Sequence, residues 1–186
     1  MKLNLGCGNR KYPDYVNVDC TSECAPDQVW DLENTPWPWE SNSVESVLFS
    51  HSLEHVGSDP RVFKEIMREL YRVCMGGAEL TVKVPHPRHD DFICDPTHVR
   101  VITPGTLSML SKRLNHEWIK AGVANTPLAI YWDVDFEIKR VEYSLDEPYR
   151  SQMAKGELSS EEIAIISRER NNIVKEITIL LVANKG

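Results

Sequence analysis

An apolar strand that runs straight into two glycines, LNLGCG at residues 3–8, limits what this chain can fold into more than any other stretch. Leu3 and Leu5 alternate with a polar residue, as in a short strand with one buried face. Two glycines one residue apart then let the backbone turn sharply and let a ligand approach it closely. The pattern predicts a first strand that ends either in a binding loop or in a plain tight turn.

A second strand is predicted at residues 15–19, YVNVD, where Val16 and Val18 alternate and Asp19 stands at the end. Only residues 9–15 join the two strands, fewer than a parallel crossover with a helix normally takes. A linker of this length still spans about 23 Å when extended, enough to return past short strands. We therefore predict a parallel pair joined by a loop or a single turn, without the usual crossover helix.

Strand and helix signals alternate along the rest of the chain, which predicts an α/β fold with a mostly parallel sheet. In such sheets ligands bind outside the carboxyl ends of the strands. The predicted strands are 44–50, 78–84, 136–145 and 173–183. The predicted helices begin at Ser58-Asp59-Pro60 and end at Gly76-Gly77, begin at Thr103-Pro104 and carry Leu107, Leu110 and Leu114, and run from Ser159 to about residue 171 behind a Ser159–Glu162 capping box.

The strand at 78–84 alternates cleanly, with apolar residues on one face and Glu79, Thr81 and Lys83 on the other. A strand covered by helices on both faces reads apolar throughout. We therefore expect one face of the sheet to be under-covered, or buried by a second copy in a homodimer.

Composition places the chain among globular proteins, with 41% hydrophobic and 26% charged residues in 186. We expect a single domain over 1–186, with a ligand-binding half at 1–85 and a substrate-side half at 86–186. The net charge of −7 gives no general attraction to nucleic acid or to an anionic membrane. No leader or long apolar run stands in the sequence, so we expect a cytoplasmic protein. Cys20 and Cys24 lack a second close pair that would complete a metal site, and free thiols are expected.

The order of these motifs resembles the class I S-adenosylmethionine-dependent methyltransferases of the small type 11 kind. The shared features are a glycine loop after the first strand, acids after the second strand and before a Pro-aromatic pair, a Leu-Glu-His segment, and Glu-Leu-Tyr-Arg-Val before two glycines. The matching stretches are LNLGCG (3–8), VNVD (16–19), DLENTPWPWESNSVESV (31–47), HSLEHV (51–56), ELYRVCMGGAELTVKVP (69–85) and, more loosely, DPTHVRVITPGTL (95–107).

The resemblance implies a Rossmann-like, mostly parallel sheet with helices and a late antiparallel strand. It is a minimal version, because the N-terminal helices that often cap the cofactor and the first crossover helix have no counterpart here. It also implies S-adenosylmethionine as cofactor and S-adenosylhomocysteine as product. The residues that the resemblance assigns to cofactor binding are Leu5, Gly6, Cys7, Gly8, Asp19, Asp31, Leu32, Ser50 and His51.

The roles follow the chemistry of each residue. The backbone N–H groups of Gly6 and Gly8 are expected to face the cofactor's carboxylate. Asp19 is expected to accept hydrogen bonds from the two ribose hydroxyls, as an ionised carboxylate can. Asp31 and Leu32 match positions that meet the adenine amino group and its apolar face. A nicotinamide cofactor is disfavoured, because its fingerprint needs a third glycine where Lys11 stands.

Other residues near this predicted site have two interpretations. Ser50 and His51 follow the central strand, where the family passes the methionine end of the cofactor, and His51 could also face substrate. Trp37 and Trp39 could wall the adenine pocket or anchor the core. Glu54 and His55 are expected to start or cap a helix.

The stretch PHPRHDDFICDPTHVR, residues 85–100, concentrates histidines and acids at the mouth of the predicted cleft. We weigh a general base, a divalent metal site and a solvated turn-rich loop. The first is preferred, with His98 as the base, Asp95 as its orienter and His86 as a further candidate. No paired histidine spacing supports a metal, so none is predicted. His98→Ala is expected to lower turnover and leave cofactor affinity unchanged.

The sequence thus predicts a methyltransferase that modifies an oxygen or nitrogen of a small-molecule or saccharide-like acceptor. Two alternatives remain. The first is a regulatory protein that binds the cofactor without catalysis. The second is a metal-dependent hydrolase that uses the His and Asp cluster at 86–98.

Overall fold

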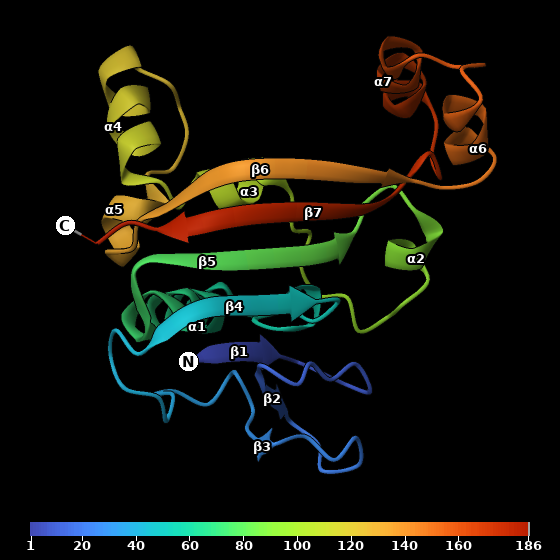
Figure 1. The fold of residues 1–186 in the computed structure, drawn as a ribbon. Helices are drawn as coiled ribbons and strands as arrows, with labels where there is room; N and C mark the ends of the chain where they lie inside the picture. The colour runs from blue at the N-terminus through green and yellow to red at the C-terminus, as the bar shows by residue number, and fades with distance from the viewer. Residues whose placement is uncertain (186) are drawn as a thin grey trace.

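One seven-stranded sheet organises the protein, and the computed structural model describes residues 1–185 (Figure 1). The strand order is β3-β2-β1-β4-β5-β7-β6. The first five strands of this order are parallel, whereas β7 is antiparallel to both β5 and β6. The strands are β1 (Lys2–Leu5), β2 (Val16–Asp19), β3 (Gln28–Val29), β4 (Val44–Ser50), β5 (Cys74–Pro85), β6 (Phe136–Leu145) and β7 (Val174–Ala183). The predicted mostly parallel α/β sheet with a late antiparallel strand is confirmed.

The helices of the described chain lie in the connections after β4, β5 and β6, and three of them begin at predicted caps, Asp59, Thr103 and Ser159. Asp59 accepts a hydrogen bond from the Arg61 N–H at the start of α1, and Ser159 and Glu162 form the capping box of α7. Within residues 1–185, no helix is long and apolar enough to cross a membrane. The helices are η1 (Leu53–His55, a 3₁₀ turn), α1 (Pro60–Val73), α2 (Asp90–Ile93), α3 (Pro104–Ser108), α4 (Lys112–Ala121), α5 (Leu128–Trp132), α6 (Tyr149–Ala154) and α7 (Ser160–Glu169).

The connection from β1 to β2 is a loop without a helix, as predicted. The loop is tied down by two buried amides at the strands. The Asn4 side chain donates to the Arg10 carbonyl at 2.8 Å, and the Asn17 side chain donates to the Tyr12 carbonyl at 3.1 Å. These bonds satisfy polar groups that the loop would otherwise bury unpaired.

The edge of the sheet at β2 and β3 is thin. β3 pairs with β2 through only Val18–Gln28 and Asp19–Val29. Beside this pairing, the Asp27 carboxylate accepts bonds from the Asn17 backbone and side chain at 2.8 and 2.7 Å. These bonds hold the pKa of Asp27 below its usual value. The edge therefore depends on the hydrogen bonds between Asn17 and Asp27 as much as on the short pairing of β2 with β3.

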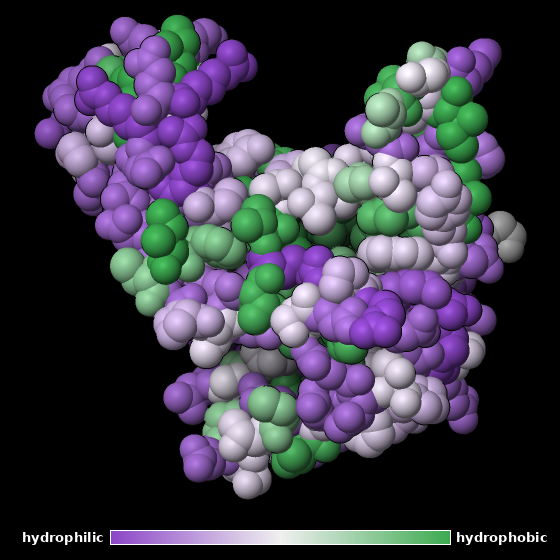
Figure 2. Space-filling model, turned by 180° about the vertical axis from the view of Figure 1, so that it is seen from behind, coloured by the Kyte–Doolittle hydropathy of each residue, from purple (hydrophilic) through white to green (hydrophobic). Residues whose placement is uncertain are grey.

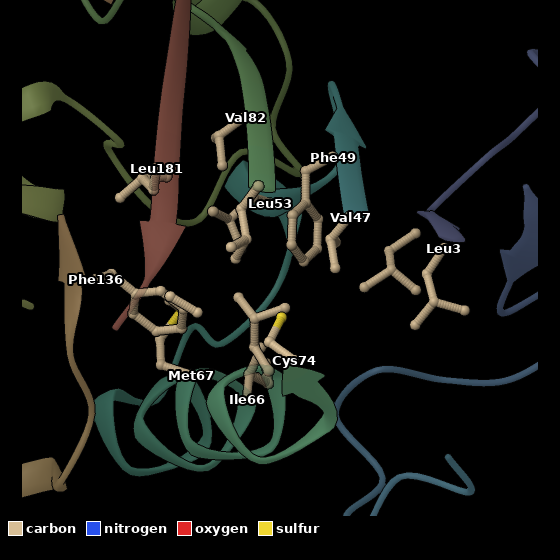
Figure 3. Close-up of a cluster of buried hydrophobic side chains, with 14 of the residues drawn as sticks. Leu3, Val47, Phe49, Leu53, Ile66, Met67, Cys74, Val82, Phe136 and Leu181 are labelled. Atoms are coloured by element: carbon tan, nitrogen blue, oxygen red, sulfur yellow. The ribbon is translucent and has the colours of Figure 1, made fainter. Parts of the chain in front are cut away.

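The core lies between the sheet and α1 (Figure 3). Ile66 and Met67 of α1 face the sheet, where Ile66 lies near Phe49 and Met67 lies beside Phe136. All of these side chains are buried. Burying an apolar side chain of this size is worth roughly 1.5–3 kcal/mol. This packing fixes the sheet whose carboxyl edge carries the candidate site.

The opposite face of the sheet carries no helix in the described part of the chain, and Figure 1 looks onto that face. The register places Glu79, Thr81 and Lys83 of β5 there, with Leu180 and Val182 of β7 beside them. The predicted alternation of β5 is confirmed, because Ala78, Leu80, Val82 and Val84 are buried on the face toward α1.

Several local predictions were wrong. Gly76 and Gly77 do not end a helix, because α1 ends at Val73 and both glycines lie inside β5. The helix expected from Thr103 through Leu114 is two helices, since the Ser111 hydroxyl accepts the Leu114 N–H and caps α4 separately. The elements β3, α2, α5 and α6 were not predicted.

Two helical projections stand out beyond the β6 edge, α4 at one end and α6 with α7 at the other (Figure 1). Figure 2 shows them from behind as separate lobes, of which the one formed by α6 and α7 is mainly hydrophilic. Both lie on the side of the sheet away from β1 and β2, so neither of them covers the loops that follow β1 and β2.

Candidate functional site

A cavity of about 280 Å³ lies at the carboxyl ends of the parallel strands. Ligands bind at this edge in open α/β sheets, and pockets for small molecules start at roughly 300 Å³. Its walls come from the loops after β1 and β2, the segment after β3, and the turn after β4. The lining residues are Gly6, Gly8, Asp19, Cys20, Trp30, Asp31, Leu32, His51, Ser52, His55 and Val56.

The glycine loop after β1 is held by its own backbone. The N–H groups of Gly6 and Cys7 both donate to the Val18 carbonyl at 2.9 Å, and the Gly8 N–H donates to Asp19 Oδ2 at 2.8 Å. The prediction that the N–H groups of Gly6 and Gly8 face a ligand carboxylate was therefore wrong, because both are already used. The glycines shape the cavity wall instead.

The two glycines differ in what surrounds them. Gly6 has a φ of 70°, and a Cβ there would lie 2.4 Å from the Ser52 Cβ. Gly8 has a φ of 47°, but a Cβ there would meet nothing within 4 Å. Gly6 is thus required by both the backbone conformation and the close approach of β1 to the turn after β4.

This difference gives a prediction with an internal control. Gly6→Ala is expected to lower the free energy of unfolding by more than the roughly 1–3 kcal/mol that a left-handed backbone costs a non-glycine residue, because Ser52 must also move. Gly8→Ala is expected to cost only the backbone strain. Urea unfolding of both variants measures the difference, and equal destabilisation would contradict the packing role of Gly6.

Two carboxylates give the cavity a negative wall. Asp19 keeps acceptor capacity although its Oδ2 accepts the Gly8 N–H, because Oδ1 accepts the Thr21 N–H at 3.3 Å and a carboxylate oxygen has a second acceptor site. Asp31 lines the same cavity, and its Oδ1 accepts the Glu33 N–H at 2.9 Å. A cation or a ligand rich in hydroxyl and amino groups suits such a wall.

The tryptophan beside the cavity is not one of the two that the sequence suggested. Trp37 and Trp39 pack edge to face, with ring centroids 5.5 Å apart, and are buried in the core. Trp30 lines the cavity instead, one residue before Asp31. The spacing Pro-Trp-Pro-Trp indicated aromatic burial and could not show which aromatic faces the ligand.

The structure brings together most of the residues predicted to bind the cofactor: Gly6, Gly8, Asp19, Asp31, Leu32 and His51 line one cavity. Leu5, Cys7 and Ser50 do not line it, because Leu5 and Cys7 are buried in the fold and Ser50 lies within β4. Burial, together with neighbouring Cys24 and Asp19, raises the pKa of Cys7 to about 11. Five further lining residues were not predicted to lie at the cavity, although each adjoins a predicted site residue or falls inside the stretch HSLEHV at 51–56: Cys20, Trp30, Ser52, His55 and Val56.

His51 stands between two cavities. It lines the cavity described above and also a second one of about 470 Å³, whose other walls include Arg10, Arg150 and Lys175. Its backbone has a φ of 55°, a left-handed conformation that is uncommon for residues other than glycine. Its Nε2 lies 2.8 Å from Glu176 Oε2, so Nε2 donates and Nδ1 keeps a lone pair.

The predicted base and its neighbours are only partly brought together. His98 Nε2 lies 3.8 Å from Asp95 Oδ2, so these two are adjacent, but the His98 side chain is only 7% exposed and does not line the first cavity. His86 lines a different cavity near α7, and burial with neighbouring Arg88 lowers its pKa. The structure therefore separates His86 from the other two.

Glu54, expected only to start or cap a helix, is the most buried acid at this edge. It lies in η1 with no exposed surface, and burial raises its pKa. The N–H groups of Val99 and Arg100 donate to its backbone carbonyl at 3.0 and 3.1 Å. These two bonds dock the segment after α2 onto η1 and bring His98 Nε2 within 4.0 Å of Glu54 Oε1.

No protein-family model and no curated protein matches this sequence. Solved structures do match. A SAM-dependent methyltransferase from Archaeoglobus fulgidus aligns over 97% of this chain and 85% of its own, with 17% identity and a TM-score of 0.59. One from Methanosarcina mazei aligns over 100% and 92%, with 13% identity and a TM-score of 0.57. The [4+2]-cyclase SpnF aligns over 100% and 75%, with 15% identity and a TM-score of 0.55.

At these identities the likeness shows the fold. The chain has the class I methyltransferase fold that the sequence resemblance predicted, with the strand order and the antiparallel β7 described above. The same architecture is shared by proteins named as methyltransferases and by one named as a cyclase, so the chemistry must be argued from the site.

Proposed function

We propose that this chain is an S-adenosylmethionine-dependent methyltransferase acting on an oxygen or nitrogen of a small-molecule or saccharide-like acceptor. The observation that carries the proposal is the cavity at the carboxyl ends of β1, β2 and β4, where Gly8, Asp19, Asp31 and Leu32 meet. Four sequence segments supply its walls, and they do so in the fold shared with methyltransferases of known structure.

The residues present fit this cofactor. The space in front of Gly8 is open and lies next to Asp19, whose free acceptor sites suit two ribose hydroxyls. Asp31 supplies an acceptor for an adenine amino group, and Trp30 and Leu32 supply apolar surface for the base. The acidic wall also suits a sulfonium cation.

The chemistry divides between cofactor and protein. When bound, S-adenosylmethionine supplies a methyl group already activated on sulfur, and its transfer to an acceptor leaves S-adenosylhomocysteine and one proton. The protein must hold the acceptor in line and remove that proton. His51 is placed for the second task, because it lines both cavities, Glu176 holds its Nε2, and its Nδ1, which lies 3.7 Å from Glu54 Oε1, keeps a lone pair.

Calorimetric titration tests the proposal. S-adenosylmethionine and S-adenosylhomocysteine are expected to bind with micromolar affinity, and NAD is expected not to bind. Absence of binding by both sulfur compounds would overturn the proposal. A screen of hydroxyl and amine acceptors with labelled cofactor then identifies the acceptor.

The regulatory alternative is tested by the same screen. A chain that binds the cofactor tightly but transfers no methyl group to any acceptor would favour it. The hydrolase alternative has less support, because the His and Asp residues of 86–98 do not form one cluster: His89 pairs with Asp146 at 3.0 Å, while His86 faces another cavity.

A further inference from the structure

The carboxylate of Glu54 has no hydrogen-bond partner within the described chain, although the side chain is fully buried. Both of its oxygens are without a donor. An isolated buried carboxylate is unfavourable unless a proton or a cation compensates it. Two ring nitrogens lie near it, His51 Nδ1 at 3.7 Å and His98 Nε2 at 4.0 Å from Oε1, but both are beyond hydrogen-bond distance, so the carboxylate calls for a further partner.

His98 faces this carboxylate with a lone pair. Its Nδ1 lies 2.8 Å from the Phe92 carbonyl, which can only accept, so Nδ1 carries the proton of the neutral ring. Nε2 then has a lone pair and lies 4.0 Å from Glu54 Oε1, beyond hydrogen-bond distance. The Nε2 lone pair of His98 and the Glu54 carboxylate therefore face each other, and neither group can donate a hydrogen bond to the other.

His55 is oriented in the same way. The Thr97 hydroxyl donates to Asp95 Oδ1 at 2.6 Å, so at its 2.9 Å contact with His55 Nδ1 it must accept. His55 therefore carries its proton on Nδ1 and has a lone pair on Nε2. One potential ligand atom from each of Glu54, His55 and His98 lies within 4.8 Å of the others.

We propose that Glu54, His55 and His98 bind a divalent transition-metal ion in the wall of the cofactor cavity. Two imidazoles and one carboxylate are ligands that suit Zn²⁺ and Fe²⁺ better than Mg²⁺. An ion at the usual bond lengths of about 2.0–2.2 Å would span the gap between Nε2 and Oε1 after only a small inward shift. A metal-binding histidine normally has a hydrogen-bond partner on the ring nitrogen that does not bind the metal. His55 and His98 both have such a partner on Nδ1.

The position of the site suggests its role, and this part rests on the proposed function. His55 lines the cofactor cavity, so the ion would lie at the cavity wall. Three protein ligands leave coordination positions open, as in catalytic rather than structural sites. The ion would hold an acceptor oxygen near the transferred methyl group and favour loss of its proton. An oxygen acceptor, in particular a hydroxyl with a second oxygen beside it, is then preferred to an amine.

A second group of potential ligands, Cys7, Asp19 and Cys24, lies near the cavity but is less suited to a metal. A thiol must lose its proton to bind a metal, and the pKa of Cys7 is raised to about 11. Asp19 Oδ2 is also already bonded to the Gly8 N–H. This group serves as the competing site in the test.

The experiment measures metal binding without any acceptor. Protein dialysed against EDTA is titrated with Zn²⁺ and Co²⁺, and bound metal is measured by elemental analysis and by the visible spectrum of Co²⁺. One ion per chain is expected in the wild type, without a thiolate charge-transfer band. Glu54→Gln and His98→Asn are each expected to weaken metal binding by more than about 100-fold. Removing a residue that only hydrogen-bonds to a metal ligand lowers metal affinity by up to about that factor, and removing a ligand itself is expected to cost more.

The controls make the result decisive. Cys24→Ser, and His116→Asn on the exposed face of α4, are expected to bind as the wild type does. Absence of binding by the wild type, or loss in Cys24→Ser with retention in Glu54→Gln, would overturn the proposal. A thermal unfolding curve for each variant identifies one that does not fold, and the two ligand variants report independently.

Titration with S-adenosylhomocysteine in the same samples separates the two proposals. Cofactor binding without metal binding would remove the metal site and leave the proposed function. Metal binding without cofactor binding would do the reverse.

Discussion

Asp19→Ala is expected to lower the affinity for S-adenosylhomocysteine by about two orders of magnitude. Hydrogen bonds to a charged group contribute roughly 1.5–3 kcal/mol each, and two such bonds to ribose hydroxyls correspond to about a 100-fold change in Kd at the lower limit. The same carboxylate holds the Gly8 N–H, so its removal also loosens the loop beside the ligand. Calorimetry on the purified variant measures the change.

The matched control is Asp14→Asn, which removes an exposed carboxylate from the loop between β1 and β2. It changes the net charge by the same amount and is expected to leave the affinity unchanged. If Asp19→Ala bound S-adenosylhomocysteine as the wild type does, the ribose would not lie at the end of β2. If both variants lost affinity equally, the effect would come from net charge rather than from a contact.

His51→Asn is expected to lower kcat by about 10²–10⁴-fold, the usual contribution of a general base, with the acceptor found by the screen. Asparagine is chosen because it tolerates the left-handed backbone that His51 adopts. Cofactor affinity is expected to change far less than kcat, because His51 lines the cofactor cavity but Asp19 and Asp31 are untouched. Steady-state kinetics and calorimetry together measure both quantities.

His86→Asn is the comparison for this variant. The sequence made His86 a candidate for catalysis, but the structure places it at a separate cavity near α7. It is expected to leave kcat unchanged. Full turnover in His51→Asn would remove the base role, and a loss confined to His86→Asn would move the acceptor site to that other cavity.

Much of the fold follows from local patterns in the sequence. The alternation at Val16 and Val18 and the apolar run of β4 specify strands by themselves, and a linker too short for a helix specifies the loop between the first two strands. β3 has no such signal, because its two residues pair only where Asp27 anchors Asn17. The break between α3 and α4 depends on the Ser111 hydroxyl, which accepts the Leu114 N–H and caps α4, and leucine spacing does not record this.

The site residues that follow directly after a strand could be predicted from the sequence, because the end of a strand fixes their position in the fold. Asp19 and Asp31 lie where the order of motifs put them. The N–H groups of the glycine loop could not be assigned, because their acceptors, Val18 and Asp19, come from the neighbouring strand. The contact between Glu54 and His98 was missed for a similar reason, since it depends on backbone bonds between distant segments.

The thin edge formed by β2 and β3 has a consequence for the protein's dynamics. Few ladder bonds resist local unfolding there, so this edge is expected to exchange its amide hydrogens sooner than β4 or β5 does. It also carries Asp19 and leads into Trp30 and Asp31, which form one wall of the cavity. A ligand that bridges this wall and the glycine loop would add roughly 2.7 kcal/mol to the stability of the native state at 100 times its Kd. Occupancy of the cavity, rather than the chain alone, then sets how well residues 20–34 resist proteolysis.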